Sequence, residues 1–175
     1  MQRVTNIHQN SLCSSVVIDD LYSRFYTADP NIGIACLYAD YKDQKNQTLV
    51  HILGCFLHQF LTTVQNPIPD EVIEKLDDIR KRGGKAGSED MLALLNIQLQ
   101  KLKLGFICID AVDELDPHVQ RQVLDTLKGW VLLTIILAYS SLGEVIWTVK
   151  CRSASKSCSN IKSTLALVHR ISKTS

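Results

Sequence analysis

Apolar residues along this chain recur with two spacings, one typical of helices and the other of buried strands. Over residues 48–64 an apolar side chain returns every three or four positions, which predicts a helix with one wide apolar face. The same spacing predicts helices over residues 12–26 and 89–103. A polar helix is expected over 70–82, and Asp116-Pro117 opens a helix over 117–128. Ser11, Ser88 and Asp116 are the predicted N-caps, and Gly83 follows the helix over 70–82 as its C-terminal glycine.

Two apolar runs lack any alternation and have the length of strands. They cover residues 32–39 and 106–109. Strands without polar positions are typical of sheets that are covered on both faces, as parallel sheets are. Because these strands alternate with helices along the chain, we predict an α/β fold with a parallel sheet flanked by helices.

Three acids, Asp110, Asp113 and Glu114, follow the second strand within five residues. Ligands of open α/β sheets bind outside the carboxyl ends of the strands, which is where Asp110 lies. An apolar strand that ends in Asp and is followed by an acid pair is typical of a Walker B segment, in which the first acid holds Mg²⁺ and a later acid orients the attacking water. Alternatively, the later acids stabilise the N-terminus of the next helix by about 0.3–1 kcal/mol each, which accounts well for Asp116 and partly for Glu114. Asp110 is not explained in that way, and both interpretations remain open.

Charge divides the chain unevenly. The 175 residues carry a net charge of +1, which argues against a protein built to bind nucleic acid. Residues 1–128 hold 13 basic and 17 acidic side chains, whereas residues 129–175 hold 6 basic and 1 acidic and are rich in serine. This shift divides the chain near residue 128. We predict one domain over 12–128, between an atypical segment over 1–11 and an unassigned tail over 129–175.

The remaining residues point to an intracellular protein. None of the six cysteines forms a C-x-x-C pair, which predicts buried free thiols in a reducing compartment, and we expect the cytoplasm. His51 and His58 share a helix face and are expected to be surface histidines, not metal ligands. A membrane span over residues 130–149 is the less favoured interpretation, because that window contains Gly143, Glu144 and two serines.

Three segments resemble the NTPase domain of fungal NACHT-type STAND proteins, whose N-terminal module is nephrocystin-like. They are SSVVIDDLYSRF at 14–25, DPNIGIACLYADYKDQ at 29–44 and FICIDAVDEL at 106–115. The resemblance implies a P-loop NTPase-like fold, with Mg²⁺ and ATP or GTP as ligands of the intact family. It also implies that Asp110 coordinates Mg²⁺, that Glu114 activates water and that Asp113 shares either role.

The chain departs from this family before its first helix. There the family has a strand and the loop G-x-x-x-x-G-K-[ST], but residues 1–13 read MQRVTNIHQNSLC. GGKAGS at 83–88 has the wrong spacing, because Ile occupies position 79 and Ala86 follows Lys85. We therefore expect a sheet without its first strand, in which either Phe106 and Ile109 are poorly covered or residues 131–137 fill the gap. A misassigned transcript or a decaying gene would explain the difference.

These features lead to one expected function and two alternatives. The expected function is a fragment of a nucleotide-dependent signalling switch, which keeps Walker B without Walker A and does not hydrolyse nucleotide or hold a cofactor on its own. The first alternative is a nucleotide-independent interaction module, with self-association as one form of it. The second is a small protein anchored in a membrane through residues 130–149.

Overall fold

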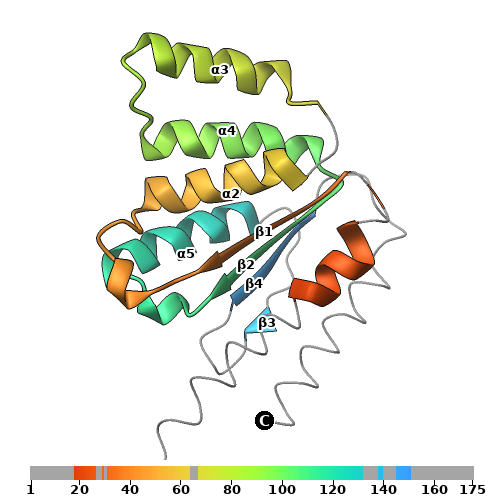
Figure 1. The fold of residues 1–175 in the computed structure, drawn as a ribbon, viewed down its shortest axis with the longest axis vertical. Helices are drawn as coiled ribbons and strands as arrows, with labels where there is room; N and C mark the ends of the chain where they lie inside the picture. Colours follow the sequence, from red (N-terminus) through yellow and green to blue (C-terminus); the bar gives the residue numbers. More distant parts are fainter. Residues whose placement is uncertain are drawn as a thin grey trace, which may run out of the picture.

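The chain folds around a small sheet that has helices on both faces (Figure 1). The computed structural model describes residues 18–26, 29, 31–63, 67–131, 138–139 and 145–150. Residues 18–21 are helical and lead into the π-helical turn η1 (Tyr22–Tyr26). The later elements are β1 (Ile32–Tyr38), η2 (Tyr41–Asp43), α2 (Leu49–Thr63), α3 (Asp70–Lys81), α4 (Ser88–Lys101), β2 (Leu104–Asp110), η3 (Val112–Glu114), α5 (Pro117–Val131), β3 (Ala138–Tyr139) and β4 (Val145–Lys150).

The sheet has the strand order β1-β2-β4-β3 and is mixed. β1 and β2 are parallel, with Ile32 opposite Leu104 and Tyr38 opposite Asp110. β4 runs antiparallel along the other side of β2, and β3 is antiparallel to β4. The α/β class is thus confirmed, whereas the prediction of a wholly parallel sheet is wrong. A short connection joins β3 to β4, and antiparallel neighbours need no helical crossover between them.

The expected gap beside β2 is not found. Phe106 and Ile109 are each only 2% exposed. β4 supplies backbone partners to β2, and the ring of Phe25 covers that of Phe106 with 5.1 Å between their centroids. The strand predicted over 131–137 cannot begin at Val131, which ends α5, and its other residues lie outside those described.

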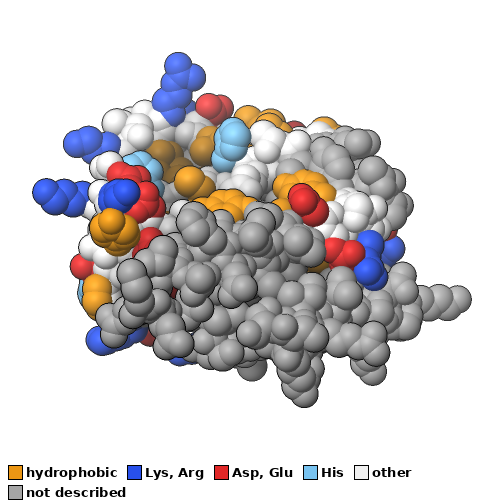
Figure 2. Space-filling model, turned by 60° about the horizontal axis from the view of Figure 1, so that its bottom comes forward, with side chains coloured by type: hydrophobic (Ala, Val, Ile, Leu, Met, Phe, Trp, Pro, Cys, Tyr) orange, Lys and Arg blue, Asp and Glu red, His pale blue; other side chains and the backbone are white. Residues whose placement is uncertain are grey.

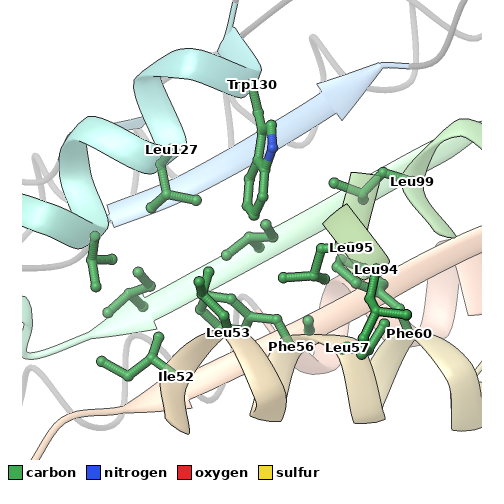
Figure 3. Close-up of a cluster of buried hydrophobic side chains, with 14 of the residues drawn as sticks. Ile52, Leu53, Phe56, Leu57, Phe60, Leu94, Leu95, Leu99, Leu127 and Trp130 are labelled. Atoms are coloured by element: carbon green, nitrogen blue, oxygen red, sulfur yellow. The ribbon is translucent and has the colours of Figure 1, made fainter. Parts of the chain in front are cut away.

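Successive side chains along β1 and β2 point to opposite faces of the sheet, and this divides the core into two parts. One part lies under the helical segment 18–26 and contains Leu21, Phe25, Ile32, Ile34, Leu104, Phe106 and Cys108. The larger part lies between the sheet and helices α2, α4 and α5 (Figure 3). Phe56 and Phe60 are fully buried there. Each such side chain contributes about 1.5–3 kcal/mol of transfer free energy.

Gly33 lets α2 approach β1 closely. A Cβ atom at this position would lie 2.6 Å from Cδ1 of Phe60 and 2.8 Å from Cδ1 of Leu102. Both distances are shorter than van der Waals contact. The absence of a side chain at Gly33 therefore makes room for the Phe60 ring above the sheet.

β1 lies at the edge of the sheet, where its outer backbone groups need partners from elsewhere. The side-chain amide of Gln59 on α2 meets this need at Cys36. Its Nε2 donates to the Cys36 carbonyl at 2.8 Å, and its Oε1 accepts from the Cys36 N–H at 2.9 Å. Gln59 thus blocks part of an edge that could otherwise pair with a further strand.

The helix ends follow the predicted signals with small shifts. Gly83 ends α3 with φ +104°, and the Gly84 N–H donates to the Ile79 carbonyl at 2.9 Å. Asp116 caps α5, its Oδ1 accepting from the His118 N–H at 2.9 Å. Gly87, not Ser88, is the N-cap of α4.

The window 130–149 is not a single helix. Trp130 belongs to α5, where its Nε1 donates to Asn96 Oδ1 of α4 at 2.7 Å, and residues 145–150 form β4. Among the described helices, none combines the length and the apolarity needed to cross a membrane. The transmembrane alternative therefore lacks its helix in the part of the chain that the structure describes.

Candidate functional site

The carboxyl ends of β1 and β2 lie side by side and bring two loops together. The Ala39 N–H donates to the Asp110 carbonyl at 3.0 Å, which extends the pairing just past the end of β1. Asp110 is partly buried, and its neighbour in register is Tyr38, which is 52% exposed. Asp110 therefore lies at the expected ligand-binding edge of the sheet.

Ala111 turns the chain sharply after β2. Its backbone has φ 54° and ψ 42°, which is the left-handed region, and it is the one described non-glycine residue with positive φ. This conformation costs an L-residue about 1–2 kcal/mol. The turn starts η3, so that Val112 enters the core while Asp113 remains exposed.

Glu114 joins the two loops. Its Oε2 accepts from the Tyr41 N–H at 3.2 Å, and its backbone carbonyl accepts from Gln44 Nε2 at 2.8 Å. Tyr41 belongs to η2, which Asp40 caps by accepting the Lys42 N–H at 2.9 Å. Glu114 thus holds the loop after β1 against the loop after β2.

The Tyr38 phenol and the Cys36 thiol, near Asp110, have shifted pKa values. Burial is the main reason that the pKa of Tyr38 is raised, and negative charge on Cys36 and Asp110 adds to it. The pKa of Cys36 is lowered, because its thiol hydrogen-bonds with that of Cys108 on the adjacent strand.

Asp110 has the chemistry of one ligand of a divalent cation, but the described residues do not complete a metal site around it. Mg²⁺ is commonly bound by one or two carboxylates together with waters and phosphate oxygens, and Asp110 fits that role. One oxygen of Glu114 already accepts the Tyr41 N–H. No group of three His, Cys, Asp or Glu side chains that could hold a metal occurs among the described residues, so Asp110, Asp113 and Glu114 do not form one. We derive no catalytic step through this metal.

A second surface feature involves α2. His51, Cys55 and His58 are exposed and line a shallow hollow of about 400 Å³ with Met91 of α4. The Nδ1 of His51 lies 2.6 Å from the Asn46 carbonyl, which makes it the donor of that pair. The prediction of surface histidines is confirmed. The prediction of buried thiols holds for Cys108 but is wrong for Cys55, which lies on the outer side of α2.

The described surface mixes charges of both signs. Figure 2 shows one face, on which basic and acidic side chains lie close to one another. Several of them form ion pairs, among which Lys103 Nζ and Asp29 Oδ2 are 2.7 Å apart. This pair lowers the pKa of Asp29, chiefly through the hydrogen bond from Lys103, and fixes the turn before β1 to the start of β2.

Together these observations define an α/β domain with acidic side chains at the carboxyl end of a parallel strand pair. The family model described as Nephrocystin 3, N-terminal matches residues 10–136. The chain therefore belongs to the nephrocystin 3 N-terminal family, and the nephrocystin-like part of the predicted resemblance is confirmed. No match was found among curated proteins or among solved structures.

The sequence pattern located the three acids but not their neighbours. Tyr41 and Gln44 come about seventy positions before Glu114, and nothing in their local spacing marks them as its partners. The available signal was topological: loops that follow adjacent parallel strands must meet at the same edge. Applied to β1 and β2, that rule would have placed residues 39–47 beside Glu114.

Proposed function

We propose that this chain is part of a nucleotide-dependent signalling switch of the NACHT-type STAND class. We further propose that it does not hydrolyse nucleotide on its own. The observation that carries the proposal is the position of Glu114, whose carboxylate holds together the loops that follow β1 and β2. A ligand that needs this carboxylate must compete with the Tyr41 N–H for it.

This competition provides a switching mechanism. When Glu114 turns toward a ligand, the Tyr41 N–H loses its acceptor and the segment Asp40–Gln47 loses one of its fixed points. The loss amounts to about 1 kcal/mol for a hydrogen bond at a solvent-accessible position. Binding at the carboxyl ends of the strands would thereby change the order of a loop on the surface, which a partner can recognise.

The roles of the acids follow from their positions. In the complete switch Asp110 would hold Mg²⁺ through water, Glu114 would orient the attacking water, and the exposed Asp113 would share either role. When bound, Mg²⁺ would neutralise charge on the phosphates of ATP or GTP. The printed sequence contains no G-x-x-x-x-G-K-[ST] segment, and GGKAGS lies between α3 and α4. Hence we propose that this chain lacks hydrolysis on its own.

Titration with fluorescent ATP and GTP analogues tests the nucleotide part. We expect no Mg²⁺-dependent binding by the 175-residue chain at millimolar nucleotide. Clear binding that disappears in Asp110→Asn would show a competent nucleotide site and contradict this expectation. Asp77→Asn is the matched control, because it removes an exposed carboxylate on α3, away from the carboxyl ends of the strands.

Hydrogen exchange at the Tyr41 amide tests the link between the loops. Glu114→Ala should raise the exchange rate about fivefold, as expected for the loss of about 1 kcal/mol. Asp113→Ala should leave the rate unchanged, because Asp113 lies on the same turn but makes no hydrogen bond to Tyr41 that the structure describes. Equal exchange rates in the unaltered chain, Glu114→Ala and Asp113→Ala would contradict the proposed switching mechanism.

A nucleotide-independent interaction module is the second candidate function. It is favoured by an exposed apolar stripe on α3, where Ile73 is 46% and Leu76 is 40% exposed. This candidate predicts association of the chain in the absence of any nucleotide.

A further inference from the structure

α3 is the outermost described helix, and its apolar residues form one face that α4 covers only in part. Figure 1 shows it stacked on α4, with α2 and the sheet beyond. Val72 and Ile79 are buried on the side that faces α4. Ile73 and Leu76, three positions apart, lie next to each other on the helix surface and remain exposed. Burial against α4 therefore accounts for only part of this apolar face.

The charges of α3 separate into paired and unpaired groups. Three ion pairs join α3, or the C-cap residue that follows it, to α4. They are Glu71 with Lys101 at 3.1 Å, Lys75 with Asp90 at 4.0 Å and the C-cap Arg82 with Asp90 at 3.0 Å. Asp70 and Arg80 are exposed, and no ion pair to either is found among the described residues. Asp70 lies one turn before Ile73, and Arg80 lies one turn after Leu76. The stripe thus has one unpaired charge of each sign at its two ends.

We propose that α3 is a dimerisation helix, which pairs antiparallel with α3 of a second copy of this chain. The twofold axis passes between Ile73 and Leu76, so that each Ile73 packs against the partner's Leu76. Asp70 of each copy then faces the partner's Arg80, and two ion pairs flank the apolar contact. A parallel pair would instead place Asp70 against Asp70 and Arg80 against Arg80, which is unfavourable.

Other partners match this surface less well. Asp70, Glu74 and Asp77 surround the stripe and would repel an anionic membrane or a nucleic acid. A second copy supplies both signs at the correct ends. A helix pair of this length buries less than about 1,200 Å², so we expect a weak and reversible dimer. The dimer requires no nucleotide, and failure of the nucleotide proposal would leave it unaffected.

Sedimentation of the 175-residue chain over a range of concentrations tests the proposal. The unaltered chain should show a concentration-dependent monomer–dimer equilibrium. Arg80→Glu and Asp70→Arg should each weaken it at least tenfold, because each replaces two attractions by two repulsions. Arg121→Glu is the matched control, an exposed arginine on α5 that should leave the equilibrium unchanged.

Mixing the two charge variants gives the most specific result. Arg80→Glu protein carries acids at both ends of the stripe, and Asp70→Arg protein carries bases at both ends. The two should form a 1:1 heterodimer in the mixture, although neither forms a homodimer alone. A monomeric unaltered chain at all concentrations would overturn the proposal, as would a dimer that tolerates both variants or a mixture that stays monomeric.

Discussion

Replacement of Gly33 by alanine tests the closest packing contact in the fold. A Cβ atom at Gly33 would lie 2.6 Å from Cδ1 of Phe60, where ordinary carbon–carbon contact is about 3.5–4.0 Å. Phe60 is fully buried between α2 and the sheet and cannot rotate into solvent. The methyl group of Leu102, 2.8 Å from the same position, closes the other side. Gly33→Ala must therefore displace α2 or the Phe60 ring.

Two opposing terms determine the size of the effect. Overpacking of a tight core costs typically 1–3 kcal/mol. Against this, alanine has less backbone freedom than glycine in the unfolded chain, which favours folding by about 0.5–1 kcal/mol. We expect Gly33→Ala to lower the free energy of unfolding by about 1–2 kcal/mol. Urea denaturation followed by circular dichroism would measure it, with an unchanged slope m as the sign of an intact two-state transition.

A double-mutant cycle identifies the cause. Phe60→Leu shortens the side chain that meets the new methyl group and on its own should cost about 1–2 kcal/mol, because it leaves a cavity. In the double variant the methyl group partly fills that space, so the combined loss should be smaller than the sum by about 1 kcal/mol. Additive losses would show that the Phe60 ring is not what Gly33 accommodates, and a stable Gly33→Ala variant would refute the packing argument altogether.

Two further predictions concern the strand ends and the turn before β1. Ala111→Gly should raise the free energy of unfolding by about 1 kcal/mol, because glycine adopts φ 54° without the cost that alanine bears. Ala93→Gly inside α4 is the control and should lower the free energy of unfolding. A lower stability of both variants would contradict the prediction. Asp29→Asn should cost about 0.5–1 kcal/mol at pH 7, since the ion pair with Lys103 is partly exposed. The pKa of Asp29 is lowered from 3.8 in the folded chain, so its contribution is present above pH 3.8 and disappears as the pH falls through the lowered value. The urea midpoints of the unaltered chain and of Asp29→Asn should therefore converge in acid. A stability difference that stays constant down to pH 2 would exclude the Asp29–Lys103 ion pair as the source of that difference.

The elements that could be predicted from the sequence are those with a strong apolar period. α2 shows this well: its predicted range 48–64 and its observed range Leu49–Thr63 differ by one residue at each end. Its apolar positions repeat over four turns, and Pro67, which disfavours a helix, follows soon after its end. The spacing of its apolar residues predicts such a helix without any knowledge of the elements that pack on it. The strand over residues 106–109 was found for a similar reason, although pairing on both sides extends it to Leu104–Asp110.

Strand direction could not be predicted in this way. Residues 145–150 have the composition of a strand, but composition does not encode which strand they join or in which orientation. β4 pairs with β2 from Leu104 to Ile109. The choice depends on contacts between segments about forty residues apart, and a parallel and an antiparallel neighbour bury the same apolar side chains. The expected gap beside β2 was inferred from the family pattern and not from these residues, and for that reason it was wrong.

The acids after β2 illustrate how one sequence pattern can have two physical causes. Glu114 fits a water-orienting acid, yet its contacts with Tyr41 and Gln44 would stabilise the two loops without any nucleotide. Asp110 has no such structural explanation: its backbone carbonyl pairs with Ala39, whereas its carboxylate contributes no hydrogen bond to that pairing. Removal of each carboxylate should therefore affect different properties. Asp110→Asn should leave folding stability nearly unchanged, whereas Glu114→Ala should loosen the loop after β1. Removal of the Asp110 carboxylate should therefore leave the contacts between the two loops intact.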